Sequence, residues 1–123
     1  MEGYNVRIER TLFGDVKGKL KVQLKDTSNA MSIERGMTFK PIAGVLLHIE
    51  NPHTSEGEKE YDVAVIVAVE GVYKTSSPSF ITALCNIMED ADDLDEAGDD
   101  WEVEVTEQKS KNNQGSFFLA KLV

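Results

Sequence analysis

The stretch that most constrains the fold is "YDVAVIVAVEGVY", residues 61–73, which is apolar at consecutive positions from Val63 to Val69. A strand with one wet face alternates apolar and polar residues, so an unbroken apolar run of this length indicates a strand covered on both faces. The chain must therefore place a packing layer on each side of this strand. With 123 residues and 41% hydrophobic content it has enough apolar side chains for one core, and we expect a single domain over residues 1–123.

Shorter alternating segments predict the neighbouring strands. Residues 4–12 alternate until Arg10 interrupts the period, residues 39–50 form a mostly apolar run, and residues 101–105 alternate valines with glutamates. Residues 26–38 have no clear period and predict a loop with one short helical turn. Residues 117–123 predict a last strand, which pairs with the strand before it as a terminal hairpin.

One helix is predicted after the central strand. Ser77 is a favourable N-cap, Pro78 suits the first helical turn, and apolar residues follow at helical spacing from Phe80 to Ala91. Gly98 is a plausible stop for the helical region.

The segment "KGKLKVQLKD", residues 17–26, alternates apolar and cationic residues. The two-residue period predicts a strand with Leu20, Val22 and Leu24 on one face. Four lysines would then form a row on the other face: Lys17, Lys19, Lys21 and Lys25.

The order of strands, one helix and a closing hairpin contains no βαβ alternation. It favours a mainly β fold with one helix, and the most economical architecture is a five-stranded antiparallel barrel of OB type.

Several classes of protein are disfavoured. One cysteine, Cys85, provides neither a disulfide nor a zinc framework, and no segment has the apolar length of a membrane span or the pattern of a signal peptide, so we expect a cytoplasmic protein. His48 and His53 lack a second histidine at ligand spacing, and phosphate-binding and acyl-transfer motifs are missing. We expect no catalytic residues, no metal and no cofactor.

The charge is concentrated in one stretch. The formal net charge is −9, yet residues 89–107 hold eleven acidic residues without any Lys or Arg, and the remainder of the chain carries +2. Asp93, Asp95, Gly98 and Glu104 fall on EF-hand positions, although other positions of that loop are unsuitable. Alternatively, the stretch is a solvated loop, or a partner-binding loop through these residues: Asp92, Asp93, Asp95 and Asp99.

A cationic, aromatic hairpin follows the acids in "EQKSKNNQGSFF", residues 107–118. Adjacent Phe117 and Phe118 point to opposite faces, and Phe117 is the better candidate for exposure because it shares its face with Lys121. Lysines and exposed rings hold single-stranded nucleic acid without sequence preference. The predicted contacts are Lys17, Lys19, Lys21, Tyr73, Lys74, Lys109, Lys111, Asn112 and Phe117.

The run "GVYKTSSPSFITALCNIMEDADD…WEVEVTEQKSKNNQGSFFLAKLV" resembles the C-terminal half of the short single-stranded DNA-binding proteins of small tailed phages with protein-primed replication. "MEGYNVRIERTLFGDVKGKLKVQL" and "TFKPIAGVLLHIEN" are similar in layout to the N-terminal half. The likeness covers the whole chain as an arrangement.

This resemblance implies an OB-type protein that coats single-stranded DNA during replication, as a monomer or weak homo-oligomer, alongside replication proteins such as a DNA polymerase. Among the family's DNA-contacting tyrosines, Tyr73 is the nearest match and Tyr61 a weaker one. The internal acidic run is a departure from many such proteins, which carry an acidic tail at the C-terminus, whereas this sequence ends in a predicted strand. The alternative hypothesis is an acidic module that imitates DNA charge and binds a basic host or replication protein, and a small enzyme is less favoured.

Overall fold

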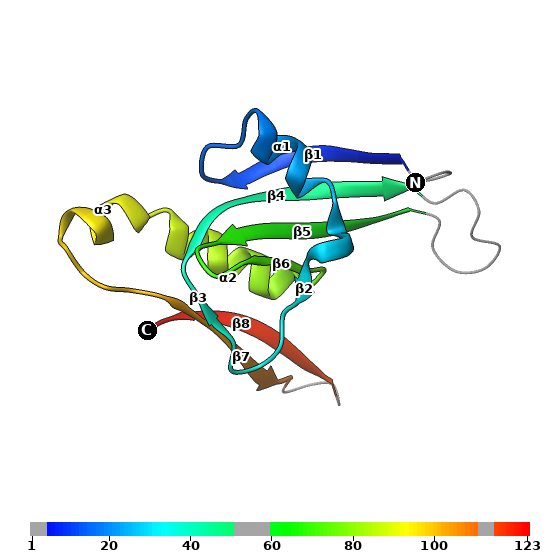
Figure 1. Cartoon of the computed structure of the whole chain (residues 1–123). Helices are drawn as coiled ribbons and strands as arrows, with labels where there is room; N and C mark the ends of the chain where they lie inside the picture. The colour runs from blue at the N-terminus through cyan, green and yellow to red at the C-terminus, as the bar shows by residue number, and fades with distance from the viewer. Residues whose placement is uncertain (1–4, 51–59, 111–114) are drawn as a thin grey trace.

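The computed structural model describes residues 5–50, 60–110 and 115–123, and the predicted contacts Lys111 and Asn112 lie outside them. The described chain consists mostly of strands, with short helices (Figure 1). The strands are β1 (Asn5–Phe13), β2 (Met31–Ser32), β3 (Thr38–Phe39), β4 (Pro41–Glu50), β5 (Glu60–Ala68), β6 (Val72–Thr75), β7 (Val103–Lys109) and β8 (Ser116–Leu122). The helical elements are α1 (Lys19–Leu24), the 3-10 turn η1 (Thr27–Asn29), α2 (Pro78–Met88) and α3 (Ala91–Glu96).

The larger sheet has the order β1-β4-β5-β6-β2, and it is mixed because β2 pairs with β6 in parallel. β5 occupies its centre, as the apolar run predicts, and pairs antiparallel with β4 along its whole length. The predicted break at Arg10 is confirmed, because the β1–β4 register shifts between Ile8 and Arg10.

The smaller sheet has the order β3-β7-β8, and its β7–β8 pair is the predicted terminal hairpin. The two sheets do not close into a barrel, so the prediction of an OB-type five-stranded antiparallel barrel is wrong. The predicted strand over residues 17–25 does not form, and among the described strands the hairpin pairs with the others through the two residues of β3.

Residues 19–24 form the helix α1 in place of the predicted strand. Leu20 and Leu24 are four residues apart, so one helical face carries both, and Leu24 is buried whereas Val22 is 70% exposed. Lys, Leu and Gln are good helix formers, and this preference prevails over the two-residue period. The lysines of this segment therefore do not form a row on a sheet.

Helix α2 begins as predicted, with Ser77 accepting a hydrogen bond from the Phe80 amide and Pro78 in the first turn. The acidic stretch does not stay a loop throughout, because its first part forms α3. Gly98 follows α3 with a φ of 76°, which is the left-handed conformation that ends helices.

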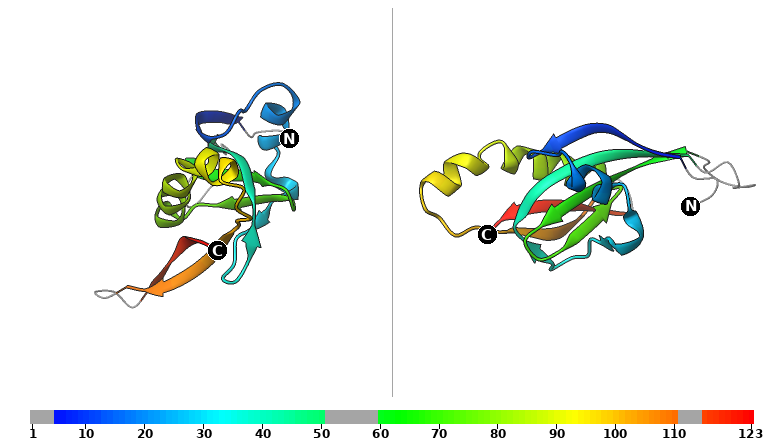
Figure 2. Two further views of the ribbon diagram at one scale, coloured as in Figure 1. Left: turned by 90° about the vertical axis from the view of Figure 1, so that its left-hand side faces the viewer. Right: turned by 45° about the horizontal axis from the view of Figure 1, so that its top comes forward.

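Two apolar cores lie on opposite faces of the central sheet. One contains Val63 and Val65 of β5 with Leu24 of α1, and the other contains Ile66 and Ala68 of β5 with side chains of α2, β7 and the segments before them. Figure 2 shows α1 and α2 on opposite sides of the sheet. The prediction that β5 is covered on both faces is thus confirmed.

No helix within residues 5–50, 60–110 and 115–123 combines the length and apolar character that crossing a membrane requires.

Candidate nucleic-acid interface

The lysines predicted to line one sheet face are dispersed by the helical geometry of α1. Lys17 precedes the helix, is exposed and forms an ion pair of 3.2 Å with Asp15. Lys19 and Lys21 are exposed on α1, where successive side chains point about 100° apart. Lys21 and Lys25, four residues apart, share one side of this segment.

Tyr73 does not end the central strand; it lies on the separate strand β6 and is only 7% exposed. Its ring stacks on Phe39 with a centroid distance of 4.4 Å and an interplanar angle of 17°. Burial raises the pKa of its phenol, and the nearby Glu70 carboxylate adds to this increase. The buried ring is a core side chain and offers no open face for stacking a base. Lys74, the next residue, is half-buried.

The terminal hairpin turns Phe118 toward the core, as the face assignment predicts, but Phe117 is less exposed than expected. Phe117 and Phe118 are both half-buried, and only Phe118 packs against the core. The Ser79 hydroxyl of α2 donates a 2.8 Å hydrogen bond to the Phe118 carbonyl, which fixes the start of β8 against the helix. Lys109 is exposed at the end of β7, opposite Ser116.

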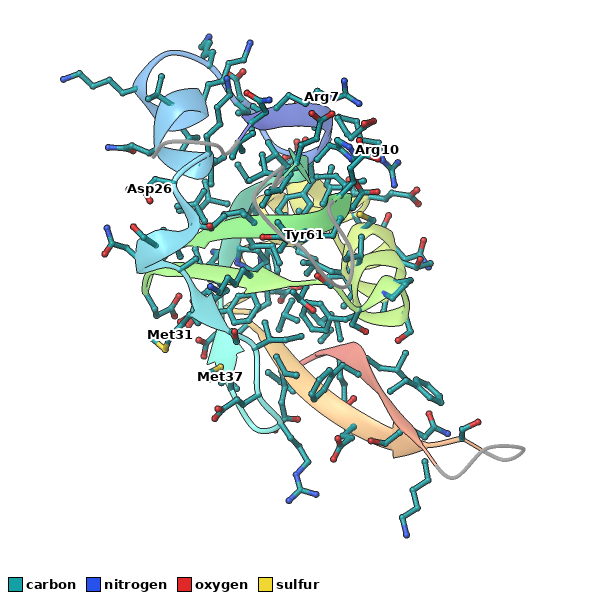
Figure 3. The ribbon with its side chains drawn as sticks, turned by 90° about the vertical axis from the view of Figure 1, so that its right-hand side faces the viewer. Arg7, Arg10, Asp26, Met31, Met37 and Tyr61 are labelled. Atoms are coloured by element: carbon teal, nitrogen blue, oxygen red, sulfur yellow. The ribbon has the colours of Figure 1, made fainter. Side chains whose placement is uncertain are left out.

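A concave surface surrounds Tyr61 at the beginning of β5, and we call it the Tyr61 groove. Two hollows of about 410 and 520 Å³ meet there and share Thr27, Ile49 and Tyr61. Lys74 and Phe118 line the first hollow, and the second lies against α1. Tyr61 is 39% exposed between them. Figure 3 looks onto this end of the molecule, with Tyr61 near its centre.

Cationic side chains follow the groove. Lys25 lines the second hollow and also a third one of about 340 Å³, which Arg10 and Lys21 line as well. Asp26 opposes these charges in the second hollow, and hydrogen bonds from the Ser28 hydroxyl and amide lower its pKa. The described lining residues of the three hollows thus include four cations and one carboxylate.

The acidic stretch is remote from the groove. Helix α3 lies at the end of the sheet opposite to the start of β5 (Figure 1). Asp92, Asp93 and Asp99 are exposed there. Asp95 is also exposed, but it accepts a hydrogen bond from the Trp101 indole and forms an ion pair with Lys40. The acidic residues of α3 are therefore separated from the groove, and Asp95 has a structural role.

The EF-hand alternative does not fit this geometry. Asp93 and Asp95 lie within helix α3 and Glu104 lies on β7, so these residues do not form a calcium-binding loop. Cys85 is half-buried, and burial raises the pKa of its thiol, which makes it a poor nucleophile.

The groove combines a partly exposed phenol ring, ammonium groups and hydroxyls. Its hollows are within the range of roughly 300–1,000 Å³ that small ligands occupy. The ring can stack on a planar group, and Lys25 and Lys74 can pair with anions on either side of it. Thr27 and Ser76 add groups that both donate and accept hydrogen bonds.

Sequence reasoning ranked Tyr61 below Tyr73 and did not select Arg10, Lys25 or Phe118. The available signal was positional: Tyr61 stands at the polar beginning of the apolar run, next to Glu60 and Asp62, whereas Tyr73 follows the run. A ring at the start of a strand, beside charged residues, is more often exposed than one that follows the buried part.

Comparison of the chain with models of protein families, with curated proteins and with solved structures gave no match.

Proposed function

We propose that the protein binds single-stranded DNA without sequence preference, with the Tyr61 groove as its interface. The observation that carries the proposal is the half-exposed Tyr61 ring between hollows that contain Lys25 and Lys74. A base stacks on the ring, and the phosphates before and after it pair with the two lysines. Stacking of this kind contributes ~1–3 kcal/mol per base.

A single strand suits these elements better than a duplex. Reading a duplex usually takes a helix with basic residues in the major groove. α2, the longest described helix, contains no Lys or Arg, and α1 has only six residues. Unpaired bases, by contrast, have open faces that one ring can stack on whatever their sequence.

The biological setting follows from the resemblance in arrangement to the phage proteins. In that setting the chain coats and protects single-stranded DNA during replication and meets replication proteins such as a DNA polymerase. The cations of the groove provide the affinity, while the acids of α3 are kept at the far end of the sheet.

Titration with oligo(dT) at two salt concentrations tests the proposal. Counterion release predicts that affinity falls steeply as salt rises, and stacking predicts quenching of tyrosine fluorescence. Electrophoretic mobility shift and fluorescence measure the two effects separately. No shift and no quenching at low salt would rule the proposal out.

An acidic interaction module is the competing function, since Asp92, Asp93 and Asp99 are exposed on or after α3. The variant D92N/D93N/D99N separates the two hypotheses. DNA binding through the groove predicts equal or stronger affinity for oligo(dT), because negative charge has been removed. An acidic module predicts no oligonucleotide binding by either protein, and capture of a basic partner by the wild type alone.

A further inference from the structure

A second cluster of polar side chains lies on the sheet face opposite Tyr61. In the β4–β5 register His48 pairs with Asp62, and Glu50 pairs with Glu60. Since side chains alternate along a strand, these four residues share one face, while Tyr61 is on the other. The β4–β5 register therefore gathers an imidazole and three carboxylates that the sequence presents as two separate pairs.

The orientation of the His48 ring is fixed by Asp62. His48 Nδ1 lies 2.8 Å from Asp62 Oδ1, and because an ionised carboxylate only accepts hydrogen bonds, Nδ1 is the donor. In the neutral ring the lone pair is then on Nε2. The His48 side chain is 18% exposed, so most of the ring is held inside the cluster.

Nε2 faces two further carboxylates. It lies 3.6 Å from Glu60 Oε1 and 3.9 Å from Glu50 Oε1. Both distances are longer than those of good hydrogen bonds but within the range of an ion pair. Arg7 is opposite His48 on β1, and its guanidinium pairs with Glu9 at 3.1 Å. When the imidazole is neutral, the negative charge of the three carboxylates exceeds the positive charge of this one cation.

The separations around Nε2 are somewhat wider than those around a bound metal ion, so the exposed Glu60 side chain would have to move inward to coordinate one. Ligand atoms bound at ~2.1 Å with tetrahedral angles lie about 3.4 Å apart. The atoms offered by His48, Glu50 and Glu60 all lie within 4.8 Å of one another. A histidine whose second nitrogen donates to a carboxylate is the usual arrangement around zinc.

We propose that His48 Nε2, Glu50 Oε1 and Glu60 Oε1 bind a divalent transition-metal ion, with Asp62 as the residue that orients the imidazole. One nitrogen and two oxygen donors suit Zn²⁺ and disfavour soft Cu(I), and the imidazole favours Zn²⁺ over Mg²⁺ or Ca²⁺. Glu60 is 62% exposed, so water can complete the coordination. The ion links the ends of β4 and β5. This site is independent of DNA binding.

Calorimetric titration of the full chain with Zn²⁺ alone tests the site. We expect one ion per chain, and a loss of at least about 100-fold in affinity in H48Q and in E60Q. D62N keeps the ligands and loses only their orientation, so its affinity should fall roughly 10- to 100-fold. The matched control D92N/D93N removes exposed carboxylates on α3 and should bind as the wild type does. Equal affinity in wild type and H48Q would overturn the proposal.

A measurement on the wild-type chain covers the case in which a variant fails to fold. In long-range ¹H–¹⁵N spectra the His48 Nε2 resonance should shift on addition of one equivalent of Zn²⁺, while Nδ1 keeps its proton. An unchanged Nε2 resonance at saturating Zn²⁺ would also overturn the assignment. Co²⁺ in place of Zn²⁺ should give visible absorption bands that H48Q lacks.

Discussion

The indole nitrogen of Trp101 donates a 2.9 Å hydrogen bond to the carboxylate of Asp95, six residues earlier in the chain. Lys40 joins the pair, with its ammonium 3.4 Å from Asp95 Oδ1 and 5.3 Å from the centroid of the indole ring. Trp101 is buried in the core next to β7. This contact attaches the acidic helix α3 to the sheet.

Asp95 should make stability dependent on pH in the acid range. The Trp101 hydrogen bond, assisted by Lys40, lowers the pKa of Asp95 below its ordinary value of 3.8. A lowered folded-state pKa gives stability that is present above the unfolded value and is lost as pH falls through the folded one. The stability advantage of wild type over D95N should therefore shrink below about pH 3.8.

Urea unfolding followed by Trp101 fluorescence at several pH values measures this advantage. D93N is the matched control, because Asp93 is an exposed acid on the same helix. A difference between wild type and D95N that stays constant down to pH 2.5 would contradict the assigned role.

Tyr61 should be the main stacking residue for DNA. Replacing it by Ala removes the ring from the groove and should weaken oligo(dT) binding about 5- to 150-fold, which corresponds to ~1–3 kcal/mol. Y61F retains the ring and should bind nearly as wild type does. Electrophoretic mobility shift at constant salt gives both affinities, because it does not depend on the fluorescence of the replaced tyrosine. The assignment fails if Y61A binds normally while F117A does not.

Lys25 and Lys74 should each contact one phosphate. Replacing either by Gln should reduce the slope of log affinity against log salt by about 0.7. Lys17 is paired with Asp15 and is not among the described lining residues of the groove, so K17Q should leave the slope nearly unchanged. Filter binding over a range of salt concentrations distinguishes the groove from the lysine row expected from the sequence.

Gly14 should be essential for the turn after β1. Its φ is 79°, and a Cβ there would lie 2.5 Å from the Ile42 carbonyl oxygen. G14A should cost more than about 2 kcal/mol, because a clash with backbone adds to the left-handed conformation. G98A is the matched control, with a φ of 76° and open space around the added atom. Equal unfolding free energies for the two variants would show that the clash is relieved.

Elements whose signals are local could be predicted from the sequence. The Ser77-Pro78 helix start and the break at Arg10 are confirmed, since caps and bulges depend on neighbouring residues. Gly98 does follow a helix, but it is the separate helix α3 and not the one predicted helix, which ends at Met88. The central position of β5 was predictable because a strand with apolar side chains on both faces must be covered on both sides.

Features that depend on tertiary packing were not predictable from one chain. Leu20, Val22 and Leu24 fit a strand by period, and the packing of Leu24 against the sheet supports the helix that the local residue preference also favours. Tyr73 is buried because Phe39 stacks on it from another strand. The approach of His48 to Glu60 depends on strand register, which the two separate pairs in the sequence do not specify.

The two cores share β5, whose alternate side chains belong to one or the other. Loss of packing on either face would remove contacts from the same strand, β5, so neither core can unfold independently of the other. The chain should consequently unfold cooperatively, with a single transition in denaturant that reports on both helical layers at once.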